Sequence, residues 1–265
     1  MRRLIPLALL VALTAGCGGG DKDEPADAEP ATASKPADVP KSQTVDSSEL
    51  GGEGFLGTCD GRKATIEASD GDDILIATQG KDVIAAGGGD DKIESFGDRD
   101  VICGGEGDDV LLGGIGPADR MFGDEGDDVL AGGDGDDLMD GGDGNDVILG
   151  EDDDDRIIGG PGDDRISANL GGDDVSGGEG NDDIATDEGR DSVDAGAGDD
   201  RVSLGESDDV ADGGEGDDAI YGGVGLDRLI GSSGLDRLFG GEDRDQCDAG
   251  GRGELTLECE KAPAP

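Results

Sequence analysis

The chain has 265 residues, with 68 acidic and 20 basic side chains, and its formal net charge at pH 7 is −48. Such a surface repels phosphates, and one Tyr and four Phe offer few rings for base stacking, so nucleic acid is not an expected partner. The absence of histidine excludes Ser-His-Asp and Cys-His catalytic arrangements. Because self-repulsion at this charge opposes compaction, a compact fold of this chain needs cations.

Residues 1–16 have the features of a signal peptide. Two arginines precede an apolar run from Leu4 to Leu13, and this run is too short to span a membrane. The following Ala-Gly-Cys sequence resembles the lipobox of bacterial lipoproteins, although Thr14 stands where Leu is commoner. The resemblance implies lipidation at Cys17 and a membrane-anchored protein at the cell surface. The alternative is a plain secretory signal with a structural cysteine and an extracellular product.

Residues 17–54 follow as a linker of Gly, Ala, Pro, Asp, Glu, Ser and Lys with almost no apolar periodicity. This composition predicts a disordered tether behind the lipidated cysteine.

Residues 55–67 are expected to cap the repeat block that comes next. Residues 59–67 have the length and phase of one nine-residue unit, with Ile66 at the inward position. Ala64 stands where every later unit has aspartate, so this segment is expected to stack without binding a metal. Caps are needed because the ends of a solenoid expose core and unpaired backbone.

Residues 68–248 consist of twenty consecutive repeat units. All have nine residues except Gly113–Phe122, which has ten, with the extra residue near Pro117. The eighth position is apolar in every unit, and the fourth is Gly in all but four, which have Asp98, Asp153, Ser207 and Asp243. Gly suits a backbone that needs a positive φ, so Ser207 is expected to be strained, and Asp98 and Asp153 less so. The sixth position is always aspartate, at Asp73, Asp82, Asp91, Asp100, Asp109, Asp119, Asp128, Asp137, Asp146, Asp155, Asp164, Asp173, Asp182, Asp191, Asp200, Asp209, Asp218, Asp227, Asp236 and Asp245.

This period predicts an all-β solenoid. A six-residue turn followed by a three-residue strand gives one inward apolar side chain, at the eighth position, with the seventh and ninth positions outward. One unit cannot bury its single Leu or Ile, whereas stacked units can.

The turns bring carboxylate and backbone carbonyl oxygens together. These are hard ligands that suit calcium, whereas zinc would require His or Cys. Several Ca²⁺ ions are therefore the expected cations, and binding and folding are expected to be coupled. Because Leu226 and Leu235 replace a carboxylate at the fifth position, the C-terminal turns are expected to load calcium last.

Units such as Gly104–Leu112 and Gly141–Leu149 resemble the GGxGxDxUx repeat of RTX, or haemolysin-type, calcium-binding proteins. The resemblance covers about two thirds of the chain. It implies a right-handed parallel β-roll with two units per turn. It also implies that calcium lies between loops of neighbouring turns, held by the sixth-position aspartates and loop carbonyls. We expect no enzymatic activity, because identical repeated carboxylates look like ligands rather than one tuned site.

Residues 249–265 are expected to form a C-terminal cap and tail, in which Glu254–Glu258 alternates as an edge strand would. Besides Cys17, an even number of cysteines in an exported chain suggests disulfides. Three pairings are open, and we expect the pairing local to each end. It joins Cys59 to Cys103 and Cys247 to Cys259.

If alternate units lie on opposite faces, an apolar stripe crosses three neighbouring strands of one face. The stripe predicts a surface for self-association or for a partner, and plain β propensity is the alternative explanation. Its residues are Val110, Leu112, Val129, Ala131, Val147 and Leu149.

These features together predict a calcium-binding module that is exported, lipid-anchored and structural or adhesive at the cell surface. One alternative is an acidic calcium buffer or spacer that stays largely disordered. A second alternative is part of a polysaccharide-modifying enzyme system.

Overall fold

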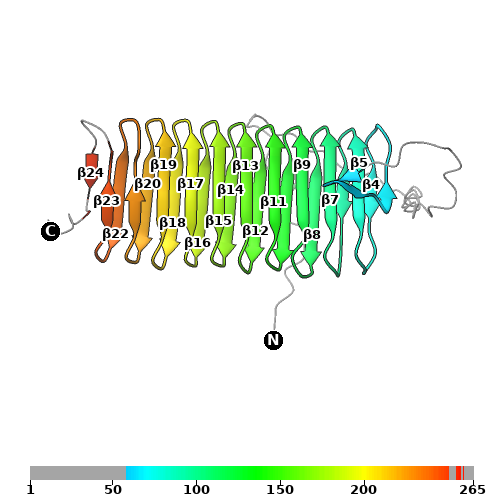
Figure 1. The fold of residues 1–265 in the computed structure, drawn as a ribbon, viewed down its shortest axis with the longest axis horizontal. Helices are drawn as coiled ribbons and strands as arrows, with labels where there is room; N and C mark the ends of the chain where they lie inside the picture. The colour runs from blue at the N-terminus through cyan, green and yellow to red at the C-terminus, as the bar shows by residue number, and fades with distance from the viewer. Residues whose placement is uncertain (1–57, 251–254, 258, 260–265) are drawn as a thin grey trace, which may run out of the picture. The chain divides into compact units, whose positions relative to one another are not determined.

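The computed structural model describes residues 58–250, 255–257 and 259. These residues form a parallel β-solenoid whose strands stack side by side along one axis (Figure 1). No helix among them is long and apolar enough to cross a membrane. The expected signal peptide, Cys17, the tether and most of the C-terminal tail lie outside the described residues.

Two parallel eleven-stranded sheets and one antiparallel hairpin make up the fold. The hairpin consists of β1 (Thr58–Cys59) and β2 (Arg62–Lys63). The odd sheet contains β3 (Ile66–Glu67), β5 (Val83–Gly88), β7 (Val101–Glu106), β9 (Arg120–Glu125), β11 (Leu138–Asp143), β13 (Arg156–Pro161), β15 (Asp174–Glu179), β17 (Ser192–Ala197), β19 (Val210–Glu215), β21 (Arg228–Ile230) and β23 (Gln246–Asp248). The even sheet contains β4 (Ile74–Ile76), β6 (Lys92–Glu94), β8 (Val110–Ile115), β10 (Val129–Asp134), β12 (Val147–Asp152), β14 (Arg165–Leu170), β16 (Asp183–Glu188), β18 (Arg201–Glu206), β20 (Ala219–Val224), β22 (Arg237–Glu242) and β24 (Leu255–Leu257).

Each strand of these sheets pairs with strands two places away in the chain, so two repeat units make one turn. Val147 lies beside Arg165, eighteen residues later. Across the ten-residue unit the offset becomes nineteen, as between Val101 and Arg120. The extra residue is therefore absorbed in the turn between β8 and β9, and alternate units lie on opposite faces as predicted.

The core contains two inward positions per unit rather than one. Most strands have six residues and continue from the seventh position through the third position of the next unit. Ile148 and Ile157, at eighth positions, are fully buried, and so are Ala168 and Leu204 at first positions. The prediction of a three-residue strand with one inward side chain was wrong, because Gly fills most first positions and gives no apolar signal. Each fully buried Leu or Ile contributes about 1.5–3 kcal/mol.

The turns need positive φ at two positions. At the fourth position, Asp153 has a φ of 83°, Asp243 of 82° and Ser207 of 102°. Asp98 does not adopt a positive φ, contrary to the prediction, because the preceding Gly97 takes it with a φ of 101°. The second position also has a positive φ in most units, which the sequence pattern did not reveal. Asp153, Asp243 and Ser207 are thus strained sites that the stacked turns hold in place.

The N-terminal end of the solenoid has two parts. Strand β3 pairs with β5 so that Ile66 lies beside Ile84 and extends the inward row. The β1–β2 hairpin is tied to the odd sheet by a disulfide from the buried Cys59 to Cys103 on β7. Asp60 in the hairpin forms an ion pair with Arg120 on β9. The hairpin is thus attached to the outer face of the odd sheet and does not cover the end of the core.

At the C-terminal end, β24 pairs with β22 and closes the even sheet. A second disulfide joins Cys247 of β23 to Cys259, with a Cα–Cα distance of 5.9 Å. The structure thus contains both bonds of the pairing local to each end.

Candidate metal sites in the turns

The sixth-position aspartates form two rows, one before the strands of each sheet, where the turns stack. All of them except Asp73 are buried, with at most 8% of the surface exposed. The strands hold them there because each directly precedes a strand in the same register as the strands one turn before and after. Two lines of buried carboxylates require hydrogen-bond donors or cations as partners, since an unpaired buried charge is costly.

From Asp91 to Asp245, the first carboxylate oxygen of each sixth-position aspartate has a backbone partner. Oδ1 accepts a hydrogen bond from the N–H of the sixth-position aspartate one turn earlier. The N–H of Asp128 donates to Asp146 Oδ1 over 2.8 Å, and that of Asp137 donates to Asp155 Oδ1 over 2.8 Å. The same bond repeats along both rows, so these side chains fix the spacing of neighbouring turns.

The second oxygen, Oδ2, is buried and accepts no hydrogen bond in every sixth-position aspartate from Asp91 to Asp245 except Asp119. Asp73 and Asp82 differ, because Oδ2 of Asp73 accepts from the Ser69 hydroxyl at 2.7 Å and that of Asp82 from the Thr78 hydroxyl at 2.8 Å. Along nearly the whole solenoid, then, each row offers a charged oxygen without a donor.

A backbone carbonyl oxygen lies close to this second oxygen. A Cβ placed on Gly141 would collide with Asp146 Oδ2 and would lie only 2.7 Å from the carbonyl oxygen of Gly159, one turn later. The same arrangement recurs at Gly150 with Asp155 Oδ2 and the carbonyl of Ala168. Two acceptors that approach one point without a donor repel each other unless a cation lies between them. These residues therefore fit the calcium sites that the sequence predicts.

Carbonyl ligands are required by the composition of the sites. Among the described residues, no three Cys, Asp or Glu side chains gather in a group that could hold a metal. Calcium commonly takes backbone carbonyls together with carboxylates, whereas structural zinc relies on Cys and His. The arrangement favours a hard cation with mixed ligands.

Burial makes these carboxyl groups difficult to ionise in the absence of a cation. Burial, together with the neighbouring charges of Asp137 and Asp173, raises the pKa of Asp155 to about 8. The Asp137 N–H, which donates to Asp155, acts in the opposite direction. Burial likewise raises the pKa of Asp128 to about 7 and of Asp109 to about 6. A row of such groups binds either protons or metal ions.

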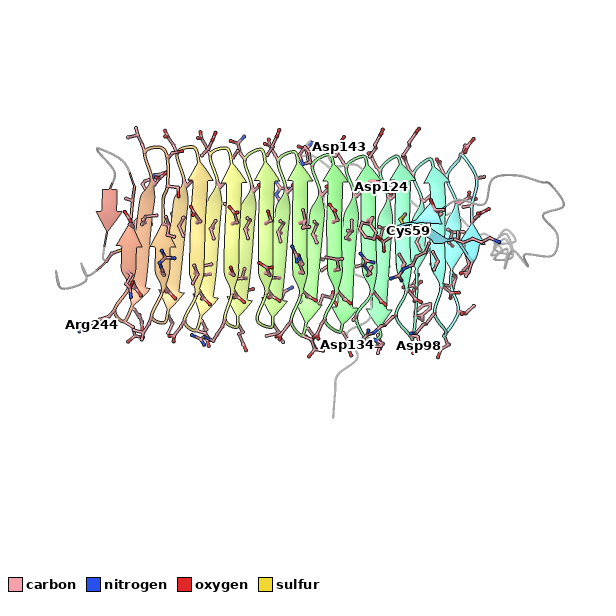
Figure 2. All side chains as sticks on the ribbon, viewed as in Figure 1. Cys59, Asp98, Asp124, Asp134, Asp143 and Arg244 are labelled. Atoms are coloured by element: carbon pink, nitrogen blue, oxygen red, sulfur yellow. A yellow bond between two sulfur atoms is a disulfide. The ribbon has the colours of Figure 1, made fainter. Side chains whose placement is uncertain are left out.

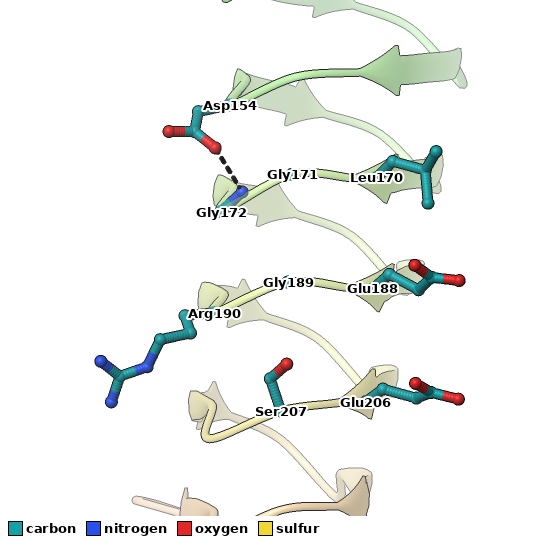
Figure 3. A pocket seen from close by; sticks show the side chains of 9 residues that line it. All are labelled: Asp154, Leu170, Gly171, Gly172, Glu188, Gly189, Arg190, Glu206 and Ser207. Carbon is teal, nitrogen blue, oxygen red and sulfur yellow. Dashed lines mark hydrogen bonds between the residues drawn. The ribbon is translucent and has the colours of Figure 1, made fainter.

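One hollow in the described surface lies between turns and has a volume of about 580 Å³. Figure 3 shows Leu170, Glu188 and Glu206 in a row on one side, while Arg190 points away from them. Asp154 Oδ1 accepts a hydrogen bond from the Gly172 N–H at 2.8 Å. The side chains around this hollow diverge and do not meet at one reacting point.

The apolar stripe lies on the outer face of the even sheet. Val129 pairs with Val110 and Val147, and Ala131 pairs with Leu112 and Leu149. All six side chains are partly buried by their neighbours on the sheet.

Sequence reasoning found the sixth-position aspartates but missed how their two oxygens differ. The first-position residue was also missed, although its frequent Gly was a signal that something lies close to that backbone. Only the register of 18 residues brings Oδ2 of one unit to the first-position carbonyl of the next turn.

Comparison with known protein families identifies the repeat units. The family model of the RTX calcium-binding nonapeptide repeat, in four copies, matches residues 67–102, 97–117, 118–148, 140–175, 149–184, 176–211, 186–220, 195–229 and 221–251. None of the curated proteins compared with the chain matches it.

Proposed function

Because the chain belongs to the family of RTX calcium-binding nonapeptide-repeat proteins, we propose that its stacked turns bind several Ca²⁺ ions and that the solenoid folds as they bind. The observation that carries this proposal is the unpartnered, buried Oδ2 that repeats along both edges beside a backbone carbonyl. Asp109, Asp146 and Asp155 are representative ligands.

The net charge supports divalent cations as the partners. Each Ca²⁺ offsets two of the 48 excess negative charges, which otherwise oppose stacking of the acidic turns. Extracellular modules bind calcium with dissociation constants of about 10⁻⁴–10⁻³ M, so weak sites suffice outside the cell.

Equilibrium dialysis of the full chain against radioactive calcium tests the binding directly. We expect several bound Ca²⁺ ions per chain that an equal concentration of Mg²⁺ does not displace, because Mg²⁺ demands stricter octahedral geometry. Binding of less than one Ca²⁺ per chain, or equal displacement by Mg²⁺, would contradict the proposal.

We also propose that the protein is exported and anchored by lipid at Cys17, with residues 17–54 as the tether. The apolar run from Leu4 to Leu13 and the Ala-Gly-Cys sequence support this placement. The two disulfides support it as well, since such bonds persist in oxidising compartments outside the cytoplasm.

Substitution of Cys17 tests the anchor. We expect Cys17→Ser to move the protein from the membrane fraction to the soluble fraction of the expressing bacterium, because a serine cannot take the thioether-linked lipid. Cys259→Ser is the matched control and should stay with the membrane. Equal membrane association of both variants would contradict lipid anchoring at Cys17.

At the cell surface, we propose a structural or adhesive role in which copies associate through the apolar stripe of the even sheet. The stripe runs across β8, β10 and β12 in register, so it offers a flat apolar face to a second copy. An acidic buffer that stays disordered would lack this face, because the face exists only when the strands pair.

A further inference from the structure

The two edges of the solenoid differ in the regularity of their turns. We define the regular edge as the turns that precede even strands, and the irregular edge as those that precede odd strands. Figure 2 shows Asp143 at the regular edge and Asp98, Asp134 and Arg244 at the irregular edge. All four units without a fourth-position Gly belong to the irregular edge, and so does the ten-residue unit. The regular edge has Gly in every unit, at Gly71, Gly89, Gly107, Gly126, Gly144, Gly162, Gly180, Gly198, Gly216 and Gly234.

A second hydrogen-bond ladder runs along the regular edge at the fifth position. The N–H of each fifth-position residue donates to the Oδ1 of the fifth-position side chain one turn earlier. The ladder begins with the Asp90 N–H to Asp72 at 3.2 Å and ends with the Leu235 N–H to Asp217 at 2.8 Å. It is continuous between these ends, and its side chains are Asp72, Asp90, Asp108, Asp127, Asn145, Asp163, Asn181, Asp199 and Asp217.

On the irregular edge the fifth-position ladder is broken. Only fragments remain, from Asp136 through Asp154 to the Gly172 N–H, and from Asp208 to the Leu226 N–H. Between these fragments, the carboxylate-to-N–H bond that repeats along the regular edge is interrupted.

Basic residues also separate the two edges. The fifth positions of the irregular edge include Lys81, Arg99, Arg190 and Arg244, whereas those of the regular edge include no basic residue. Arg190 Nη2 lies 3.7 Å from Asp208 Oδ2, so this guanidinium already offers a positive charge to a turn of its own edge. A cation bound nearby is repelled by it.

The charge at the fifth position acts on the sixth-position carboxylate beside it. Asp108 directly precedes Asp109, and Asp90 lies one turn earlier, where its Oδ1 accepts a hydrogen bond from the Asp108 N–H at 3.2 Å. The same fifth-position charges attract a divalent cation that binds at Asp109. Calcium affinity rises with the negative charge of the site and with its rigidity, and the regular edge has more of both.

We infer that calcium binds in two classes sorted by edge, with a continuous row of tighter sites along the regular edge and weaker, interrupted sites along the irregular edge. This inference rests on the proposed calcium binding and adds which residues set the affinity. The sixth-position carboxylates are common to both edges, so the difference comes from other positions of the turns, chiefly the fourth and fifth. At the first position, the hydroxyls of Ser95 and Thr186 on the irregular edge also donate to carbonyl oxygens one turn later.

Matched triple variants of the full chain test the sorting. The regular-edge variant carries Asp109→Asn, Asp128→Asn and Asp146→Asn, and the irregular-edge variant carries Asp173→Asn, Asp227→Asn and Asp245→Asn, all in units with Gly or Ala at the first position. Asparagine keeps Oδ1 as the acceptor of the neighbouring N–H. In equilibrium dialysis against calcium, the regular-edge variant should lose ions of the tight class, with a rise of about tenfold in the calcium concentration at half-saturation. The irregular-edge variant should lose ions of the weak class only.

If the triple variants fail to fold, a variant that is expected to gain calcium affinity provides a second test. Arg99→Asp with Arg190→Asp should extend the fifth-position ladder and increase the number of tightly bound ions. The control, Arg156→Asp with Arg165→Asp, makes the same change in net charge on the outer sheet faces and should leave that number unchanged.

Four results would overturn the inference. A single class of sites in the unsubstituted chain, or equal effects of the two triple variants, would do so while calcium binding itself stood. An equal gain in the Arg99, Arg190 variant and its control would assign the effect to total charge. No calcium binding by the unsubstituted chain would overturn the proposed function as well.

Discussion

At the scale of the residue, the fold depends on the sixth-position aspartate, whose two carboxylate oxygens have different roles. Most buried sixth-position carboxylates tie their turn to the preceding one through Oδ1 and leave Oδ2 without a hydrogen-bond donor, as Asp146 does beside the carbonyl of Gly159. The hydrogen bond stabilises the stack, whereas the unpartnered oxygen destabilises it until a cation or a proton arrives. Asp155 illustrates both effects, since its Oδ1 is bonded and its Oδ2 is not.

This arrangement predicts that the metal-free protein is more stable in mild acid than at neutral pH. The folded pKa of Asp128 and Asp137 is raised from 3.8 to about 7, and that of Asp155 to about 8. Because a raised pKa favours the protonated folded state, this contribution is complete below about pH 4 and is lost as the pH rises through about 6 to 8.

Thermal unfolding in the presence of a chelator, followed by circular dichroism at pH 5 and pH 8, checks this dependence. The melting temperature should be higher at pH 5. With saturating calcium the order should reverse or vanish, since calcium requires the ionised carboxylates. A chelated protein that melts at a higher temperature at pH 8 would contradict the assignment of these groups.

Gly162 illustrates a backbone position that no other residue fits. Its φ is 144°, and a Cβ there would collide with the carbonyl oxygen of Gly144 one turn earlier. We expect Gly162→Ala to destabilise the calcium-loaded protein by about 1–3 kcal/mol, measured by urea unfolding. Gly172→Ala is the control, because its Cβ would meet its nearest atom at 3.4 Å and its φ is not positive. Equal losses in both variants would contradict the close approach of the turns at Gly162.

At the scale of the element, the period of the sequence predicted the sheets but not the length of the strands. Alternating units, parallel pairing and inward eighth positions such as Ile148 were confirmed. The six-residue strands were not predicted, since hydrophobic alternation disappears where Gly150 follows Leu149. The attachment of the β1–β2 hairpin to the odd sheet was also not predicted, because strands of two residues carry no periodic signal.

The apolar stripe of the even sheet leads to a prediction about association. Val129→Lys with Leu149→Lys should abolish concentration-dependent association of the calcium-loaded protein in analytical ultracentrifugation, because two buried ammonium groups would oppose contact between copies. The control, Leu138→Lys with Ile158→Lys, makes the same charge change on the odd sheet and should associate normally. Loss of association in both variants, or in neither, would show that the stripe is not the interface.

At the scale of the whole molecule, the stability of the fold depends on a balance between charge repulsion and the apolar core. A net charge of −48 repels stacked acidic turns, while the inward rows of Leu, Ile, Met and Val stabilise the stack. The sequence revealed both sides of this balance, because composition and period are visible without a structure. It could not reveal that the two edges differ in their fifth-position ladders, since that follows from which units share an edge.

The most direct test of the account is far-UV circular dichroism of the full chain during a calcium titration at pH 7.5, with magnesium as the control. The account predicts a cooperative gain of β signal with calcium alone, because binding and folding are coupled. A coil spectrum that calcium leaves unchanged, or a β signal that is complete in the presence of chelator at this pH, would contradict it.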